Sequence, residues 1–185
     1  AWIALTKFGI TYWAALVVSP LVVGAFGIVL ERTMLRKLYK LDHLYGLLLT
    51  FGLALIIEGF FREQFGVSGE SYEVPDALAG GVSLGFMFLP IYRGWVVVAA
   101  LAVCFSTWFL NEKTKLGAYL RAGTENPAMV QALGINVPLL ITFTYGYGVA
   151  LAAFAGVLAA PIFQVNPLMG SNLIIVVFAV VVIGG

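Results

Sequence analysis

Charged residues are scarce in this sequence of 185 residues. Only 10% are Asp, Glu, Lys or Arg, whereas 62% are hydrophobic; soluble domains have roughly 25% and 45–50%. So little polar surface excludes a water-soluble globule. Runs of about 20 apolar residues, enough to cross a bilayer as a helix, recur in place of the short alternating segments of a membrane β-barrel. The sequence therefore predicts an all-α fold, a polytopic bundle of transmembrane helices.

The sequence also lacks the residues of most catalytic and nucleotide-binding sites. With one cysteine and one histidine, it has no intrachain disulfide and no cluster with the spacing of metal ligands. No G-x-x-x-x-G-K-[ST] segment is present to hold ATP phosphates, and no basic cluster is present to bind nucleic acid. We therefore expect no catalytic residue, metal, cofactor or nucleic-acid partner.

Four apolar runs are long enough to span a bilayer. We place them at Ile10–Leu30, Leu44–Phe61, Tyr92–Leu110 and Leu139–Phe163. A fifth run begins near Asn172 and is cut off, and Ala1–Thr6 is a candidate end of an earlier span. Because the sequence opens without methionine and ends inside an apolar run, we expect one transmembrane domain over residues 1–185, incomplete at both ends.

Lysine and arginine concentrate in two of the links between these spans. Residues 31–43 and 111–138 hold seven of the ten basic residues, and basic links are retained in the cytoplasm. The link 62–91 has Arg62 as its one basic residue against four acidic ones. We therefore expect the two basic links on the cytoplasmic side and residues 62–91 on the outer side.

The link 111–138 contains the polar stretch "TENPAMVQALG", which predicts a short helix. Thr124 or Asn126 can cap its start, and Pro127 suits its first position. Gly134 can adopt the left-handed conformation that ends it. Glu125 adds negative charge near the N-terminus, which the helix dipole favours.

A helix of about two turns is marginal alone in water, so this one needs a surface to pack on. Its apolar face consists of Met129, Val130 and Leu133, and a second such face lies upstream at Leu116, Tyr119 and Leu120. The ends of the spans, the membrane surface and a soluble partner are all candidates for that surface.

The fourth span has a small residue at every fourth position: Gly148, Ala152, Gly156 and Ala160. Such a stripe lets two helix backbones approach closely in a membrane. We expect tight packing there, within the chain or against a second subunit, and keep the lining of a pathway as a weaker alternative.

Glu58 is the ionisable residue that lies clearly inside a span. A carboxylate at mid-membrane costs roughly 2.5–3.5 kcal/mol on insertion scales, so it is typical of a pathway or a proton site. Arg62 lies four residues later on the same helix face and can pair with it. We favour this pair near the outer end of the span and keep Glu58 as a candidate pathway residue.

Four segments, in this order over nearly the whole chain, resemble the inner-membrane permease of branched-chain amino acid ABC transporters. They are "LERTMLRKLYKLDHLYGLLLTFGLALIIEGFFREQFG", "GGVSLGFMFLPIYR", "EKTKLGAYLRAGTENPAMVQALGINV" and "GVLAAPIFQVNPLMGSNLIIVVFAVVVIGG". Related urea and amide importer permeases share much of this layout, so amino acids and amides both stay open as substrates.

The resemblance implies a bacterial inner-membrane permease subunit of an ATP-driven importer, with residues 62–91 in the periplasm and ATP bound by partner subunits. The implied partners are two ATPase subunits, a second permease subunit, identical or different, and a periplasmic amino acid-binding protein. Residues 111–138 become a cytoplasmic coupling loop that docks on the ATPase. The residues matching that loop are Glu125, Asn126, Pro127, Ala128 and Gly134, with Tyr119 and Arg121 in the same region.

Two other classes of function are weaker alternatives. A gradient-driven secondary transporter or channel favours inverted repeats and several intramembrane ionisable groups, whereas this sequence has one such carboxylate and no evident repeat. A membrane enzyme needs polar catalytic groups near an interface, and none can be assembled here; an inert assembly subunit completes the alternatives.

Overall fold

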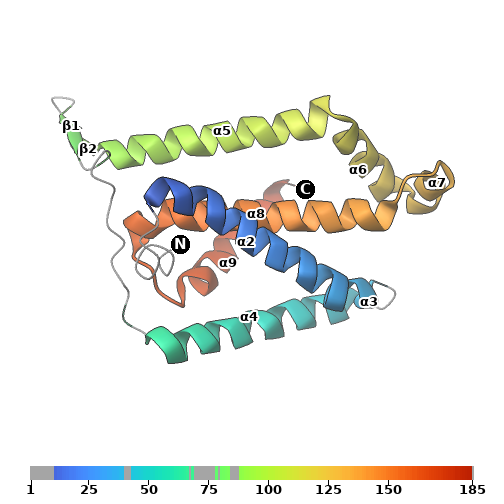
Figure 1. Cartoon of the computed structure of the whole chain (residues 1–185), viewed down its shortest axis with the longest axis horizontal. Helices are drawn as coiled ribbons and strands as arrows, with labels where there is room; N and C mark the ends of the chain where they lie inside the picture. Colours follow the sequence, from blue (N-terminus) through green and yellow to red (C-terminus); the bar gives the residue numbers. More distant parts are fainter. Residues whose placement is uncertain are drawn as a thin grey trace. The chain divides into compact units, whose positions relative to one another are not determined.

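The fold is described from a computed structural model of the chain (Figure 1). The residues it describes are 11–39, 43–66, 68, 78, 80–83 and 88–184. The candidate end of an earlier span, Ala1–Thr6, lies outside these residues, as do Glu70, Glu73 and Asp76 of the acidic link.

Long apolar helices make up most of the described chain. They are α2 (Tyr12–Leu30), α4 (His43–Phe65), α5 (Ile91–Lys113) and α8 (Val137–Phe163), and each contains a run that is long and apolar enough to cross a membrane. The 16-residue α9 (Met169–Gly184) is shorter. The helices match the predicted spans with shifts of only a few residues at their ends, so the predicted all-α, polytopic class is confirmed.

The first helix continues beyond the predicted end of its span. After α2 the chain forms one π-helical turn, η1 (Glu31–Leu35), and then α3 (Arg36–Leu38). Pro20 lies inside α2, which continues through it. Glu31, at the start of the π-helical turn, is fully buried. The basic link 31–43 is therefore helical from Glu31 to Leu38.

The link between α4 and α5 contains a short β-hairpin that the sequence did not predict. β1 (Gly81–Ser83) pairs antiparallel with β2 (Phe88–Pro90). Ile91 donates its N–H to the carbonyl of Gly80 at 2.9 Å, so the hairpin leads directly into α5. Strands of three residues are too short for an alternating pattern to appear in the sequence.

These elements group into two compact units, each described by itself. The first comprises Ala1–Ser19, Val29–Glu73 and Phe154–Gly185, and the second comprises Pro20–Ile28 and Val74–Ala153. The helices α2 and α8 contribute residues to both units.

In the second unit, α2 and α8 pack closely at glycine residues. A Cβ atom at Gly24 would lie 3.0 Å from the Cβ of Ala150. On the other helix, a Cβ atom at Gly146 would lie 2.8 Å from Cδ1 of Ile28. The two backbones approach this closely because neither glycine has a side chain.

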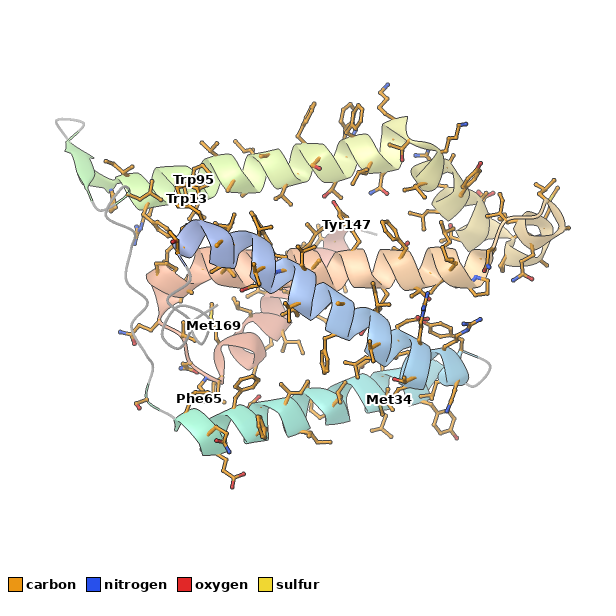
Figure 2. All side chains as sticks on the ribbon, viewed as in Figure 1. Trp13, Met34, Phe65, Trp95, Tyr147 and Met169 are labelled. Carbon is orange, nitrogen blue, oxygen red and sulfur yellow. The ribbon has the colours of Figure 1, made fainter. Side chains whose placement is uncertain are left out.

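Polar side chains on α8 are satisfied within the second unit. Thr107 of α5 and Tyr147 of α8 share a hydrogen bond of 3.2 Å between their hydroxyl groups. Figure 2 labels Tyr147 on α8. Thr142 and Thr144 donate to carbonyl groups one turn earlier in α8, at 3.0 and 2.9 Å. These bonds fit a packing role for the polar residues of this helix.

The predicted stripe of small residues does not make the contact between α2 and α8. Gly148, Ala152 and Gly156 are exposed, and no atom lies within 4 Å of a Cβ placed at either glycine. Ala160 is the buried member of the stripe. The contact uses Gly146, which is rotated by roughly 200° from Gly148 around the helix. Packing of the stripe, within the chain or against a second subunit, therefore stays a prediction.

In the first unit, buried apolar residues lie in the first half of α2, in η1 and in the second half of α8. They are Tyr12, Ala15, Leu35, Val157, Leu158 and Ala160. A tight turn follows α8: Gln164 has a φ of 60°, and the Asn166 side chain accepts the N–H of Leu168 at 2.6 Å. The turn brings the start of α9 near the end of α4; Figure 2 labels Met169 and Phe65 on these two helices.

Candidate functional site

The link 111–138 starts with a sharp corner at the end of α5 (Figure 1). Thr114 has an extended backbone, with φ −111° and ψ 158°, so α5 stops and α6 (Lys115–Glu125) begins in a new direction. The Thr114 hydroxyl donates to the Leu110 carbonyl at 2.5 Å, which satisfies one carbonyl at the helix end. Gly117 lies directly against the backbone of Asn111, so α6 is held close to α5.

The short helix predicted from the sequence is α7 (Pro127–Ala132). Its N-cap is Asn126, whose Oδ1 accepts the N–H of Met129 at 3.1 Å, and Pro127 occupies the first turn. Thr124 belongs to α6 instead, and its hydroxyl donates to a carbonyl of that helix at 2.8 Å. Of the two predicted caps, Asn126 is confirmed and Thr124 is wrong.

The end of α7 is closed by a Schellman motif. Gly134 has a φ of +83° and donates its N–H to the Gln131 carbonyl at 2.9 Å. Ile135 donates its N–H to the Val130 carbonyl at 3.3 Å. These two bonds satisfy carbonyls that the helix itself leaves without partners. The predicted left-handed conformation of Gly134 is confirmed.

Replacing Gly134 with alanine is expected to open this end of α7. A Cβ atom in the left-handed region costs roughly 1–2 kcal/mol, so amide hydrogens of residues 130–135 should exchange correspondingly faster. Gly134→Asn is the control, because asparagine tolerates this conformation. Hydrogen–deuterium exchange of the full-length protein measures both, and equal exchange in the two variants would contradict the prediction.

The fold buries only part of the apolar face predicted on α7. Val130 is only 3% exposed, whereas Met129 and Leu133 are 64% and 73% exposed. On α6, Leu116 and Tyr119 are also exposed. The chain buries one residue of the predicted face and leaves the pair Met129 and Leu133 open, at positions one helical turn apart.

The remaining predicted coupling residues lie at the surface around α7. Arg121 forms an ion pair of 3.0 Å with Glu112 of α5, and both side chains are more than half exposed. Such a pair contributes about 0–1 kcal/mol, so its main effect is to orient α6 against α5. Glu125 is the last residue of α6 and Ala128 lies in α7; both are exposed.

Asn136 is a further capping residue, which the sequence reasoning missed. Its Oδ1 accepts the N–H of Leu139 at 3.2 Å, at the start of α8. The segment "NVP" could have predicted this cap, because an asparagine shortly before a proline is typical of a helix start. Both helices that follow α6 thus begin with an asparagine cap, and Pro138 lies in the first turn of α8.

Glu58 has a different partner from the one predicted. Its Oε2 accepts the hydroxyl of Ser171 in α9 at 2.5 Å. Glu58 and Arg62 both lie in the described part of the chain and form no ion pair with each other, so the predicted Glu58–Arg62 pair is wrong. The two α4 residues share a helix face, but the hydroxyl of α9 lies closer to the carboxylate than the guanidinium does.

Within the described ranges, no group of three His, Cys, Asp or Glu residues lies close enough together to hold a metal ion. The features that stand out are the capped helix α7 with its open apolar pair and the carboxylate inside α4. Long apolar helices joined by a polar link of this kind define a polytopic α-helical membrane protein.

The chain belongs to the family described as branched-chain amino acid transport system, permease component, whose model matches residues 1–185. The BraD permease protein of a high-affinity branched-chain amino acid transport system in Pseudomonas aeruginosa is 31% identical over 93% of this chain and 57% of its own length. A "probable branched-chain amino acid transport permease protein LivH" of Methanocaldococcus jannaschii is 30% identical over 100% of this chain and 61% of its own length. LivH of Escherichia coli K12, also named as a high-affinity permease protein, is 27% identical over 98% of this chain and 62% of its own length.

The chain therefore spans about three fifths of the length of these relatives. No solved structure matches it. The family confirms the predicted resemblance and assigns the chain to transport proteins of the membrane.

Proposed function

We propose that this chain is the permease part of an ATP-driven importer that moves branched-chain or related amino acids across a bacterial inner membrane. Support comes from the family and from relatives named as branched-chain amino acid transport permeases. The chain makes and breaks no bonds in this proposal. Partner subunits bind and hydrolyse the ATP, and the chain needs no cofactor of its own.

The observation that carries the proposal is the exposed apolar pair on α7. This helix has an asparagine cap, a proline in its first turn and a Schellman motif, so its backbone is fixed at both ends. A rigid helix with Met129 and Leu133 open to the surroundings suits docking into an apolar groove of a partner protein. We assign that groove to the ATPase subunit.

The predicted coupling residues have separate roles in this docking. Asn126, Pro127 and Gly134 shape α7, while Ala128 leaves room beside it. Around it, Tyr119, Arg121 and Glu125 provide a polar and aromatic rim. Closure of the ATPase dimer around ATP then moves α7, and α6 passes the motion to α5 through their corner.

Topology follows from the distribution of basic residues. With residues 31–43 and 111–138 in the cytoplasm, α7 faces the ATPase, and residues 62–91 face a periplasmic amino acid-binding protein. The exposed stripe of Gly148, Ala152 and Gly156 is the surface we assign to the second permease subunit, because small residues permit close helix contact in a membrane.

Leu133→Glu is expected to release the ATPase from the full-length permease. A charge in the centre of an apolar contact costs about 2 kcal/mol or more, which weakens binding roughly 30-fold. Gln131→Glu is the matched control, because it adds the same charge to α7 on the opposite side of the helix. The measurement is co-purification of the complex from native membranes, with attached subunits identified by mass.

Two results would count against the proposal. Equal ATPase recovery with Leu133→Glu and Gln131→Glu would remove α7 as the docking helix. Recovery of the wild-type permease without any ATPase, with uptake that follows an ion gradient, would instead establish the secondary transporter.

A further inference from the structure

A cavity of about 750 Å³ lies in the first unit between α4, the turn after α8 and the first turn of α9. This volume is within the range of roughly 300–1,000 Å³ that is usual for small-molecule sites. Phe51, Leu55 and Phe61 line it from α4, and Ile174 lines it from α9. The wall is therefore mostly apolar and aromatic.

The polar groups of this cavity gather around one carboxylate. Glu58 lines the cavity beside Ser171, which donates its hydroxyl to Oε2, and Asn166 lines it from the turn. Within the described part of the chain, Ser171 is the only hydrogen-bond partner of Glu58. The carboxylate therefore keeps capacity for another donor, because an ionised carboxylate accepts about four hydrogen bonds.

Glu58 lies deep enough in α4 that its carboxylate is expected to need a second hydrogen-bond donor. It lies seven residues before the end of the helix at Phe65, about 10 Å along the axis. At this depth in a membrane span, a carboxylate normally pairs with a cation or lines a substrate path. Its nearest basic neighbour in sequence, Arg62, does not pair with it.

We propose that this cavity is a substrate site for an aliphatic amino acid, with Glu58 binding the α-ammonium group. The ammonium supplies, in a charge-assisted hydrogen bond, the cationic donor that the carboxylate lacks among the described residues. Phe51, Leu55 and Ile174 contact the branched alkyl chain. This inference rests on the proposed importer function and specifies where the permease holds its cargo.

A structural role for Glu58 is the competing explanation. Ser171 lies in the first turn of α9, where negative charge is favoured by the helix dipole. In that case Glu58 would only fasten α9 to α4, and loss of the Ser171 hydroxyl would have the same effect as loss of the carboxylate.

The first test uses the wild-type, full-length permease complex in lipid nanodiscs, without a binding protein. Radiolabelled leucine is displaced by two analogues at equal concentration: 3-methylbutylamine, which keeps the ammonium and the alkyl chain, and 4-methylpentanoate, which keeps the carboxylate and the alkyl chain. We expect the amine to compete and the acid to have no effect. Competition by the acid alone would overturn the proposal, and this result needs no variant to fold.

The second test measures leucine binding by variants of the same complex. Glu58→Gln is expected to weaken binding roughly tenfold or more, because an ionic hydrogen bond is lost. Ser171→Ala should weaken it much less, and Glu63→Gln, an exposed carboxylate on the same helix, should leave it unchanged. Equal losses for Glu58→Gln and Ser171→Ala, or no loss for Glu58→Gln, would overturn the proposal.

These outcomes are distinct from failure of the importer function. If Glu58→Gln binds leucine normally while the complex still contains its ATPase, the cavity is not the substrate site and the importer stands. If no ATPase accompanies the permease, the importer function fails, and competition by the two analogues still decides the chemistry of the cavity.

Discussion

Gly117→Ala is expected to break the corner between α5 and α6 and to lower the stability of the protein by about 3 kcal/mol. A Cβ atom at this position would overlap the carbonyl of Asn111 and lie 2.7 Å from its Cα. Real Cβ atoms do not make such contacts with backbone, and no side-chain rotation relieves them, so α6 has to move away. The expected loss is at the upper end of the range for overpacking.

Gly123→Ala in the same helix is the matched control, with an effect of opposite sign. A Cβ atom there would meet Cδ2 of Leu140 at 3.8 Å, which is ordinary contact. Replacing glycine by alanine inside a helix gains roughly 0.5–1 kcal/mol. The apparent Tm of the full-length permease in detergent measures both, and equal shifts for Gly117→Ala and Gly123→Ala would contradict the predicted corner.

Local rules of chain geometry were enough to predict the helices and the ends of α7. Apolar runs of about 20 residues define spans because the bilayer sets their length. Asn126, Pro127 and Gly134 define α7 because capping depends on residues within one turn. The cap at Asn136 follows the same rule and was predictable.

Contacts between distant segments were not predictable from the sequence. The α8 sequence offers small residues on two faces, one with Gly146 and one with Gly148, and periodicity favours the longer stripe. The neighbour that decides between them is Ile28 of α2, more than a hundred positions away. Helix propensity depends on the local sequence and carries no information about a partner so far away in the chain.

The partner of Glu58 illustrates the same limit of local reasoning. Spacing along the helix favoured Arg62, four residues later, because residues at i and i+4 are neighbours. The turn formed by Gln164 and Asn166 brings Ser171 to the carboxylate instead. Nothing in the sequence around Glu58 indicates that turn.

Gly146→Leu is expected to separate α2 from α8 in the second unit. Even a Cβ atom at this position would overlap Cγ1 of Ile28 and lie 2.8 Å from its Cδ1. Isoleucine is stiff because it branches at Cβ, so it cannot turn aside without strain. Overpacking predicts a loss of about 3 kcal/mol, which should appear as a lower apparent Tm and less monodisperse full-length protein in detergent.

Gly148→Leu, on the opposite face of the same helix, distinguishes an effect on folding from an effect on subunit assembly. No atom lies within 4 Å of a Cβ there, so the permease should fold with an unchanged apparent Tm. If the exposed stripe contacts a second permease subunit, the same variant should lose that subunit during purification, because leucine prevents close helix approach. A folded Gly148→Leu permease that keeps its full set of subunits would show that the stripe faces lipid. Equal damage to folding by Gly146→Leu and Gly148→Leu would contradict the assignment of the contact between α2 and α8 to Gly146.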